Sequence, residues 1–213
     1  GNDIRPLGEG MRDGQVVLTA GTEITPGVIG VLATVKCAQM KVYRRPSVAI
    51  LATGDELEGL DEAFDPNKIP NSNSYALMAQ AQALGLQHVA FFDPVPKAQI
   101  PSFLAQIDIA YIGWQRVPIY RFGIAPNKLM DYMMARCVVL HSVEAGNDPV
   151  AEAGCGLTVP PADPPAIADG LRQLARLDAA TRERMGAAGR QFVLDNHIYP
   201  VLARRFLDAC RTA

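Results

Sequence analysis

The chain has 213 residues, of which 49% are hydrophobic and 20% charged, so it has enough apolar material for a buried core and cannot be largely disordered. Its formal charge of −2, from 20 Lys and Arg against 22 Asp and Glu, argues against a partner nucleic acid bound through bulk positive charge. Four cysteines without C-x-x-C spacing and three scattered histidines predict neither a metal site nor a disulfide framework. We therefore expect a cytoplasmic protein.

Apolar patterns with periods of two and of 3.6 residues alternate along the chain, which predicts an α/β fold. In chain order we expect a strand at 15–19, a helix at 26–34, strands at 41–43 and 47–53, a helix at 72–84, a strand at 88–92, a helix at 96–106, a strand at 108–112, a helix at 127–135, strands at 138–140 and 153–159, a helix at 163–177, and helix from 181 onward with breaks at Gly186, Gly189 and Pro200. The longest uncharged run, 69–87, has a polar start and internal glutamines, which predicts no integral membrane segment.

The alternation after residue 46 predicts a Rossmann-like, doubly wound parallel sheet. We expect the strands at 47–53, 88–92, 108–112 and 138–140 to lie in one sheet. Residues 1–46 are rich in glycine and turns, and we expect them to form a small appended N-terminal lobe that contains β-structure. The chain is thus predicted to have two domains, 1–46 and 47–213.

Motifs in the first part of the chain resemble the molybdopterin molybdotransferases, the gephyrin-like family that inserts molybdate during molybdenum-cofactor synthesis. They are Gly1-Asn-Asp-Ile-Arg-Pro6, Ala20-Gly-Thr-Glu-Ile-Thr-Pro26, Val42-Tyr-Arg-Arg-Pro46, Val48-Ala-Ile-Leu-Ala-Thr-Gly-Asp-Glu-Leu57 and Asn71-Ser-Asn-Ser74. The resemblance covers residues 1 to about 86. It implies the end of that family's linker region, followed by the first strand and helix of its molybdopterin-binding domain.

From about His88 onward, the chain is similar to group 1 bacterial glycosyltransferases, which are retaining enzymes with two Rossmann domains. The similarity rests on Phe92-Asp-Pro-Val-Pro-Lys97, on the segment 120–135, and on the segment 144–161, which includes Asn147-Asp-Pro-Val-Ala-Glu-Ala-Gly-Cys-Gly156. It implies the nucleotide-sugar-binding, C-terminal domain of that family.

The two resemblances meet between Gly85 and His88 without a linker. At this point both families have a strand, a helix and a strand inside a Rossmann-like sheet. We therefore interpret the chain as chimeric or truncated, with a composite domain built from 47–86 and 88–213 whose junction respects βαβ topology.

The molybdotransferase resemblance implies that Asp55 and Glu56, directly after the strand at 47–53, are remnants of a molybdate or molybdopterin site. Magnesium and molybdopterin would be the cofactors of this alternative. The residues themselves are better explained by a solvated acidic loop.

The glycosyltransferase part has a candidate nucleotide-sugar site around a predicted helix N-terminus, which offers free N–H groups to an anion. Its residues are Arg121, Gly123, Ile124, Asn127, Lys128, Asp131 and Glu144. Asn127 is a candidate cap, Lys128 and Arg121 supply positive charge for a diphosphate, and the resemblance implies that Asp131 binds ribose. The alternatives are an ion pair between Lys128 and Asp131, three residues apart on a solvated helix face, and ordinary turn chemistry around Glu144.

The resemblance as a whole implies the nucleotide-sugar-binding half of an enzyme for polysaccharide or lipopolysaccharide synthesis. The acceptor domain of that family has no counterpart here, so we expect no turnover by this chain alone and no required cofactor, with a nucleoside diphosphate sugar as the ligand. The alternatives are a molybdopterin-binding module and a non-catalytic folded scaffold. A face that has lost its partner domain also predicts a homodimer, with the helix at 199–210 docked on a second copy or on 1–46. Peripheral membrane contact is implied for the intact glycosyltransferase family.

Overall fold

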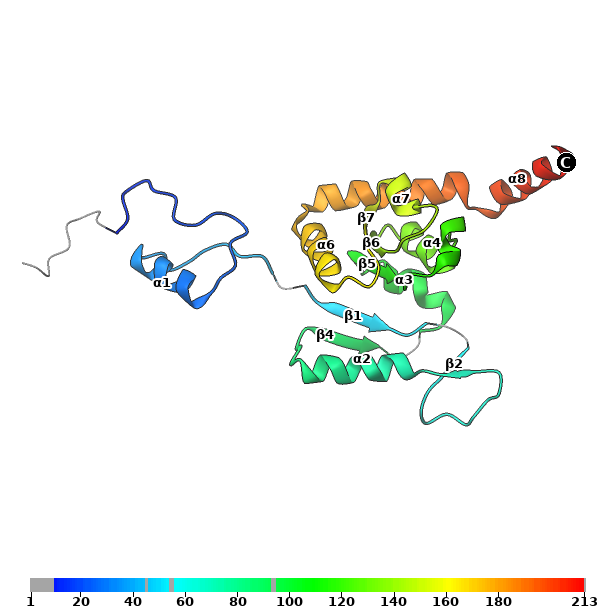
Figure 1. Ribbon diagram of the computed structural model, residues 1–213, viewed down its shortest axis with the longest axis horizontal. Coiled ribbons are helices and arrows are strands. Elements are labelled where there is room, and N and C mark those ends of the chain that lie inside the picture. Colours follow the sequence, from blue (N-terminus) through cyan, green and yellow to red (C-terminus); the bar gives the residue numbers. More distant parts are fainter. Residues whose placement is uncertain (1–9, 45, 54–55, 93–94, 213) are drawn as a thin grey trace, which may run out of the picture. The chain divides into compact units, whose positions relative to one another are not determined.

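The structure is a computed structural model that describes residues 10–44, 46–53, 56–92 and 95–212 (Figure 1). The chain divides into two compact units, residues 1–44 and residues 45–213. Each unit is described by itself below. The larger unit has an α/β fold with parallel sheets, as predicted.

The described part of the smaller unit, residues 10–44, contains one helix, α1 (Pro26–Thr34). The Thr25 hydroxyl accepts a hydrogen bond from the Val28 N–H at 3.3 Å, and proline occupies the first turn, as expected for a helix start. The prediction of strands at 15–19 and 41–43 is wrong, because both stretches have irregular backbone. Their β-branched residues favour strands, but a strand also needs a ladder partner, and none of residues 10–44 provides one.

The core of the larger unit is a parallel sheet with the order β5-β6-β7, formed by β5 (Ile109–Gly113), β6 (Val138–Ser142) and β7 (Gly156–Val159). All five side chains of β6 are buried, because helices cover both faces of this central strand. On one face lie α4 (Asn127–Met134) and α7 (Ala179–Asn196), and on the other lies α6 (Pro164–Arg176).

A second parallel pair joins β1 (Val48–Leu51) to β4 (Val89–Phe92), with α2 (Ser72–Ala83) between them in the chain. Val48 faces Val89 and Leu51 faces Phe92 in this register. The strand before the junction, β1, therefore pairs with the strand after it, β4, as predicted. The segment between β1 and α2 contains a short parallel bridge of β2 (Leu57–Glu58) and β3 (Ile69–Pro70).

The prediction of one continuous sheet is wrong. Among the described residues no ladder joins β1 or β4 to β5, so the strands form separate sheets of two and three. In the usual doubly wound order 3-2-1-4-5-6, the pair β4-β1 fits positions 3 and 2, and β5-β6-β7 fits positions 4, 5 and 6. In the order 2-1-3-4-5 the same strands would read β4-β1-β5-β6-β7, with β1 beside β5. Both orders are compatible with the pairs that form.

Several helices differ from the sequence prediction. The predicted helix at 96–106 is the short turn η1 (Lys97–Gln99) followed by α3 (Ile100–Leu104), and η2 (Pro118–Phe122) lies in the loop after β5. The start of the predicted strand at 153–159 is instead the end of a helix, α5 (Pro149–Ala153), which the sequence analysis missed.

The predicted breaks at Gly186 and Gly189 do not occur, because α7 runs through both residues. A Cβ at Gly186 would collide with the Arg136 carbonyl oxygen, and one at Gly189 would lie 2.9 Å from Cys155 Cβ. These glycines let α7 approach the sheet layer closely. The chain does break before the last helix, α8 (Tyr199–Thr212), with Pro200 in its first turn. No helix in the described part of the chain is both long and apolar enough to span a membrane.

Candidate functional site

The loops that follow β5, β6 and β7 are joined to one another at the carboxyl edge of the sheet. The Trp114 N–H donates to the Ser142 carbonyl at 3.0 Å, and the Ser142 hydroxyl donates to the Pro160 carbonyl at 3.1 Å. Open α/β sheets bind ligands at this edge. All seven residues of the predicted nucleotide-sugar site lie in the loops after β5 and β6 or in α4, which follows the first of these loops.

Asn147 holds the loop after β6 against the loop after β5. Its Oδ1 accepts from the Ile124 N–H at 2.7 Å, and its Nδ2 donates to the Ile124 carbonyl at 3.0 Å. Next to it, the Gly146 N–H donates to the Tyr120 carbonyl at 2.8 Å, and any side chain at Gly146 would collide with the Arg121 carbonyl. We call these contacts the Asn147 clamp. They fix the backbone of residues 120–124 immediately before α4.

The clamp changes which N–H groups can face a ligand. The Ile124 N–H is used by Asn147, and the Gly123 N–H donates to the Tyr120 carbonyl at 2.9 Å, with Gly123 at a φ of 104° that favours glycine. These two donors are occupied within the protein. The expectation that Asn127 caps α4 is wrong, because Pro126 occupies the N-cap position and Asn127 is the first helical residue. The N–H groups of Asn127 and Lys128 therefore have no acceptor inside the helix.

The charged residues of α4 do not pair with each other. Lys128 Nζ donates to the Thr53 carbonyl, two residues after β1, at 3.4 Å, and no ion pair with Asp131 is found among the described residues. The Asp131 side chain is exposed, with no hydrogen bond assigned to it among the described residues. In η2, the Arg121 guanidinium lies 4.6 Å from the centre of the exposed Phe122 ring.

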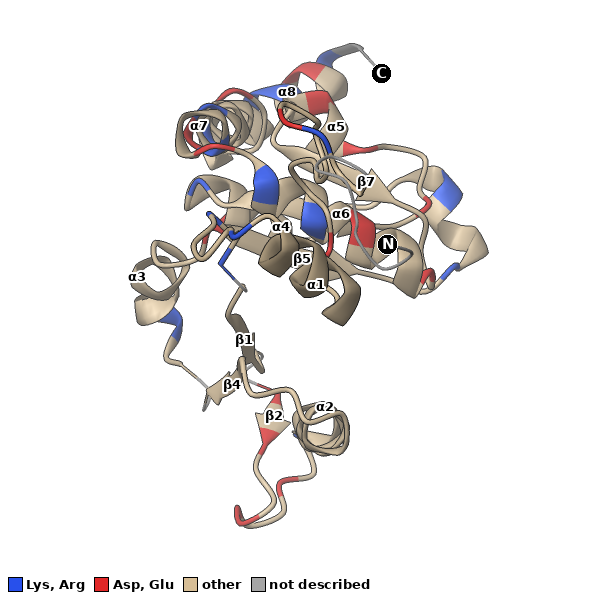
Figure 2. Ribbon diagram, turned by 90° about the vertical axis from the view of Figure 1, so that its left-hand side faces the viewer, with Lys and Arg blue, Asp and Glu red and all other residues tan. Residues whose placement is uncertain are grey.

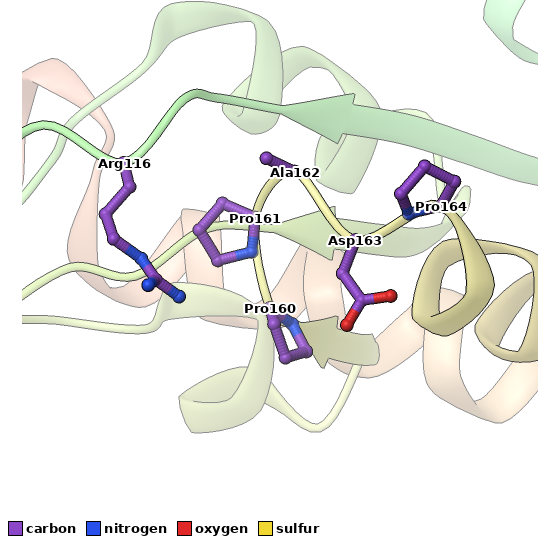
Figure 3. Close-up of a pocket in the computed structure, with 6 residues that line it drawn as sticks. All are labelled: Arg116, Pro160, Pro161, Ala162, Asp163 and Pro164. Carbon is purple, nitrogen blue, oxygen red and sulfur yellow. The ribbon is translucent and has the colours of Figure 1, made fainter.

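Glu144 forms an ion pair with Arg116, with Oε2 and Nε 2.8 Å apart, and both side chains are largely exposed. Arg116 also lines an open hollow of about 410 Å³ at the same sheet edge. Figure 3 shows Arg116 on one side of this hollow, Asp163 and Pro164 at the start of α6 on the other, and Pro160 and Pro161 between them. Asp163 caps α6, as predicted, by accepting from the Ala166 N–H at 3.0 Å.

His141, at the end of β6, is fully buried and forms a pair that the sequence analysis missed. Its Nδ1 lies 3.4 Å from Asp148 Oδ1, and its ring meets the Trp114 ring edge to face with centroids 5.6 Å apart. Nε2 has no hydrogen-bond partner in the part of the chain that the structure describes. Burial lowers the pKa of His141 below its ordinary value, although the nearby Asp148 carboxylate partly opposes this effect.

Asp148 also caps α5, by accepting from the Ala151 N–H at 3.1 Å, and Pro149 follows at the first helical position. The Asp-Pro sequence is therefore the signal that would have predicted this helix, since the same pattern at Asp163 and Pro164 was recognised as a helix start.

The acidic loop of the molybdotransferase-like part lies apart in the chain, after β1. Asp55 lies outside the described residues, and Glu56 is exposed. Glu58 is buried and accepts from the Asp65 N–H at 3.0 Å, so it closes its own loop (Figure 2, red residues around β2). Glu62 faces Lys68 at 3.7 Å. In the part of the chain that the structure describes, no group of three or more His, Cys, Asp or Glu is arranged to hold a metal ion.

The molybdotransferase resemblance is confirmed by comparison with known proteins. No family model matches the chain. Molybdopterin molybdenumtransferase of Bacillus subtilis is 45% identical over 85 residues, and that of Staphylococcus aureus is 46% identical over 85 residues. Each match covers 40% of this chain, and the chain spans 20% of the relative's length.

The glycosyltransferase resemblance is supported at the level of the fold. A sucrose-phosphate synthase of Thermosynechococcus elongatus has a TM-score of 0.58 and 18% identity, covering 76% of this chain and 37% of its own. A glycosyltransferase of Rickettsia africae has a TM-score of 0.54 and 13% identity, and the match covers 87% of this chain and 52% of the glycosyltransferase. Anabaena HepE, solved with UDP-glucose, has a TM-score of 0.51 and 14% identity, and the match covers 65% of this chain and 36% of HepE. The chain carries both resemblances.

Proposed function

We propose that the larger unit binds a nucleoside diphosphate sugar at the carboxyl edge of the β5-β6-β7 sheet. The observation that carries this proposal is the Asn147 clamp, which fixes the loop leading into α4, whose first N–H groups have no acceptor within the helix. A helix start of this kind is a ready site for phosphate. The UDP-glucose bound to Anabaena HepE, which shares the fold, is consistent with the same class of ligand.

Each residue has a role in this proposal. The N–H groups of Asn127 and Lys128 would bind the diphosphate. Lys128 Nζ donates to the Thr53 carbonyl at the long distance of 3.4 Å, so a phosphate oxygen would be a better acceptor. Arg121, exposed in η2, would add a second cation, and the exposed Asp131 carboxylate would accept from two ribose hydroxyls. The pair of Glu144 with Arg116 would border the nucleotide.

We also propose that the chain alone does not transfer sugar. It spans 36–52% of the structures whose fold it shares, so in the proposal it supplies one wall of a cleft that needs two. Transfer requires donor and acceptor to be held together. Because the chain supplies only part of the contacts, we expect a dissociation constant in the millimolar range, which corresponds to a binding free energy of about −4 kcal/mol.

Trp114 is the single tryptophan and lies at the proposed site, so its fluorescence reports binding. We expect saturable quenching by UDP-glucose and UDP and none by uridine, because the diphosphate supplies the anionic contacts. Asp131→Ala should weaken binding at least tenfold, since each hydrogen bond to a charged group contributes about 1.5–3 kcal/mol. The matched control is Glu183→Ala, which removes an exposed carboxylate from α7 and should bind as wild type. Equal affinity of Asp131→Ala and wild type would exclude this site.

A second candidate function, a molybdopterin-binding module, is favoured by the 45–46% identity to molybdenumtransferases. Among the described carboxylates after β1, Glu58 bonds its own loop, Glu62 pairs with Lys68, and no three acidic side chains are grouped to hold a metal ion. We therefore derive no metal-dependent step for this chain. A non-catalytic scaffold is the third candidate, and it predicts that neither nucleotides nor molybdopterin-like phosphates change the Trp114 signal.

The composite organisation, with a lobe at 1–46 and a domain joined from 47–86 and 88–213, remains part of the proposal. The homodimer expected from the sequence is also a proposal. The proposed wall of the cleft carries exposed apolar residues, including Phe122 of η2, and such surfaces favour self-association.

A further inference from the structure

The last helix, α8, exposes an apolar stripe along its length. Every side chain from Leu202 to Arg211 is exposed, whereas Val201, on the opposite side of the helix, is half-buried. At 3.6 residues per turn, the apolar residues share one side of the helix. They are Tyr199, Leu202, Ala203, Phe206, Leu207 and Cys210. We propose that this stripe pairs with the same stripe of a second copy of the chain, with the two helices antiparallel.

The area of the stripe is close to what a specific pair needs. Tyr199 is 88% exposed, Phe206 69%, Leu207 54% and Leu202 42%. With about 200 Å² for an aromatic side chain and about 150 Å² for a leucine, these four expose about 450 Å² per copy, or about 900 Å² in a symmetric pair. Specific interfaces start at about 1,000 Å² in total, and Ala203, Cys210 and the flanking backbone add to the sum.

The sequence of the stripe is complementary to itself in one antiparallel register. When Phe206 faces Ala203 of the second copy, Leu202 faces Leu207, and Tyr199 faces Cys210. Each large aromatic side chain then meets a small one, and the leucines meet each other. A two-fold axis repeats all three contacts, which is the self-complementarity that a symmetric dimer interface requires.

Protein is a better occupant of this face than an anionic membrane, because most cations of α8 are already engaged. Arg205 donates to the side-chain and backbone oxygens of Asn196 at 2.7 and 3.2 Å, and Arg211 lies 3.8 Å from Asp208. That leaves Arg204, on the polar side, as the α8 arginine for which no pairing is assigned among the described residues. A helix that binds anionic lipid normally carries many Lys and Arg on its polar face.

The Arg205 contact also prepares α8 for pairing. It satisfies the Asn196 carbonyl at the end of α7 and so fixes the bend between the two helices. At the same bend, the Phe192 and His197 rings lie 5.4 Å apart. A helix held in one direction loses less conformational freedom when it binds.

The first test is the mass of the full chain in solution, measured by light scattering over a hundredfold range of concentration. We expect the mass to approach twice that of the chain as concentration rises. The double variant Leu202→Glu/Phe206→Glu should stay monomeric, and the control Arg204→Glu, which reverses a charge on the polar side, should still dimerise. Circular dichroism verifies that the variants keep their helices. A monomeric wild type, or a double variant that dimerises as wild type does, would overturn the proposal.

The second test fixes the register. In a Cys37→Ser background, where Cys210 is the remaining exposed cysteine of the described residues, we introduce Tyr199→Cys and add oxidised glutathione. Antiparallel pairing places residue 199 against Cys210 of the other copy, so this variant should form a disulfide-linked dimer at least tenfold faster than the background protein. Equally fast linkage of the background protein would indicate parallel helices and contradict the proposal. So would a monomer that sediments with anionic phosphatidylglycerol vesicles.

Discussion

Replacing Asn147 with alanine removes both hydrogen bonds that hold the loop before α4. The bonds, at 2.7 and 3.0 Å, join one side chain to both polar groups of the Ile124 backbone. Each contributes about 0.5–1.5 kcal/mol net, and water can reach the half-buried site to replace part of what is lost. We therefore expect Asn147→Ala to lower the free energy of unfolding by about 2 kcal/mol, which corresponds to a fall in Tm of about 4–8 °C.

Urea denaturation followed by circular dichroism measures this change. The matched control is Asn73→Ala, which removes an exposed asparagine from α2 and should alter stability by no more than about 0.5 kcal/mol. Asn147→Ala should also weaken the UDP-glucose response of Trp114, because the α4 start is no longer held in place. Identical denaturation midpoints for Asn147→Ala and Asn73→Ala would refute the importance assigned to the clamp.

Three further predictions follow from burial and pairing. Burial lowers the pKa of His141, so the unfolded chain binds more protons than the folded chain below pH about 6.5. The free energy of unfolding should therefore fall as the pH drops from 7 to 5. In urea titrations, His141→Gln should flatten this pH dependence. Hydrogen exchange should be slow in β6, which is paired on both sides and buried, and at least a hundredfold faster in β1; equal rates would indicate one continuous sheet. A thiol reagent should label the two exposed cysteines quickly and spare the two for which burial raises the pKa to about 11, and four fast labels would contradict the packing around α7. The exposed pair is Cys37 and Cys210, and the buried pair is Cys137 and Cys155.

Local signals in the sequence predict much of the fold. The helix start at Asp163 and Pro164 follows from capping and proline geometry, and the apolar run at 138–140 predicts the buried central strand. The local sequence does not predict the role of two glycines in α7. Gly186 and Gly189 look like breaks in a helix, but their role depends on Arg136 and Cys155, which lie far away in the chain.

The same limit applies to the sheet and to the site. Residues 15–19 have strand propensity without a ladder partner, and β1 and β5 lie in separate sheets, because strand pairing depends on contacts between distant segments that no local pattern reports. Sequence predicted which segments reach the carboxyl edge. It did not predict that Asn147 occupies the Ile124 N–H, because that contact joins two loops 23 residues apart.

Chemical-shift mapping tests the central claim, nucleoside diphosphate sugar binding at the start of α4, most directly. Uniformly ¹⁵N-labelled protein is titrated with UDP-glucose to several millimolar, with uridine as the control ligand. The account predicts saturable shifts at the N–H groups of Asn127 and Lys128, with smaller shifts at Asn147, and none at Glu56. Shifts confined to the acidic loop after β1, or no saturable shift at α4, would contradict it.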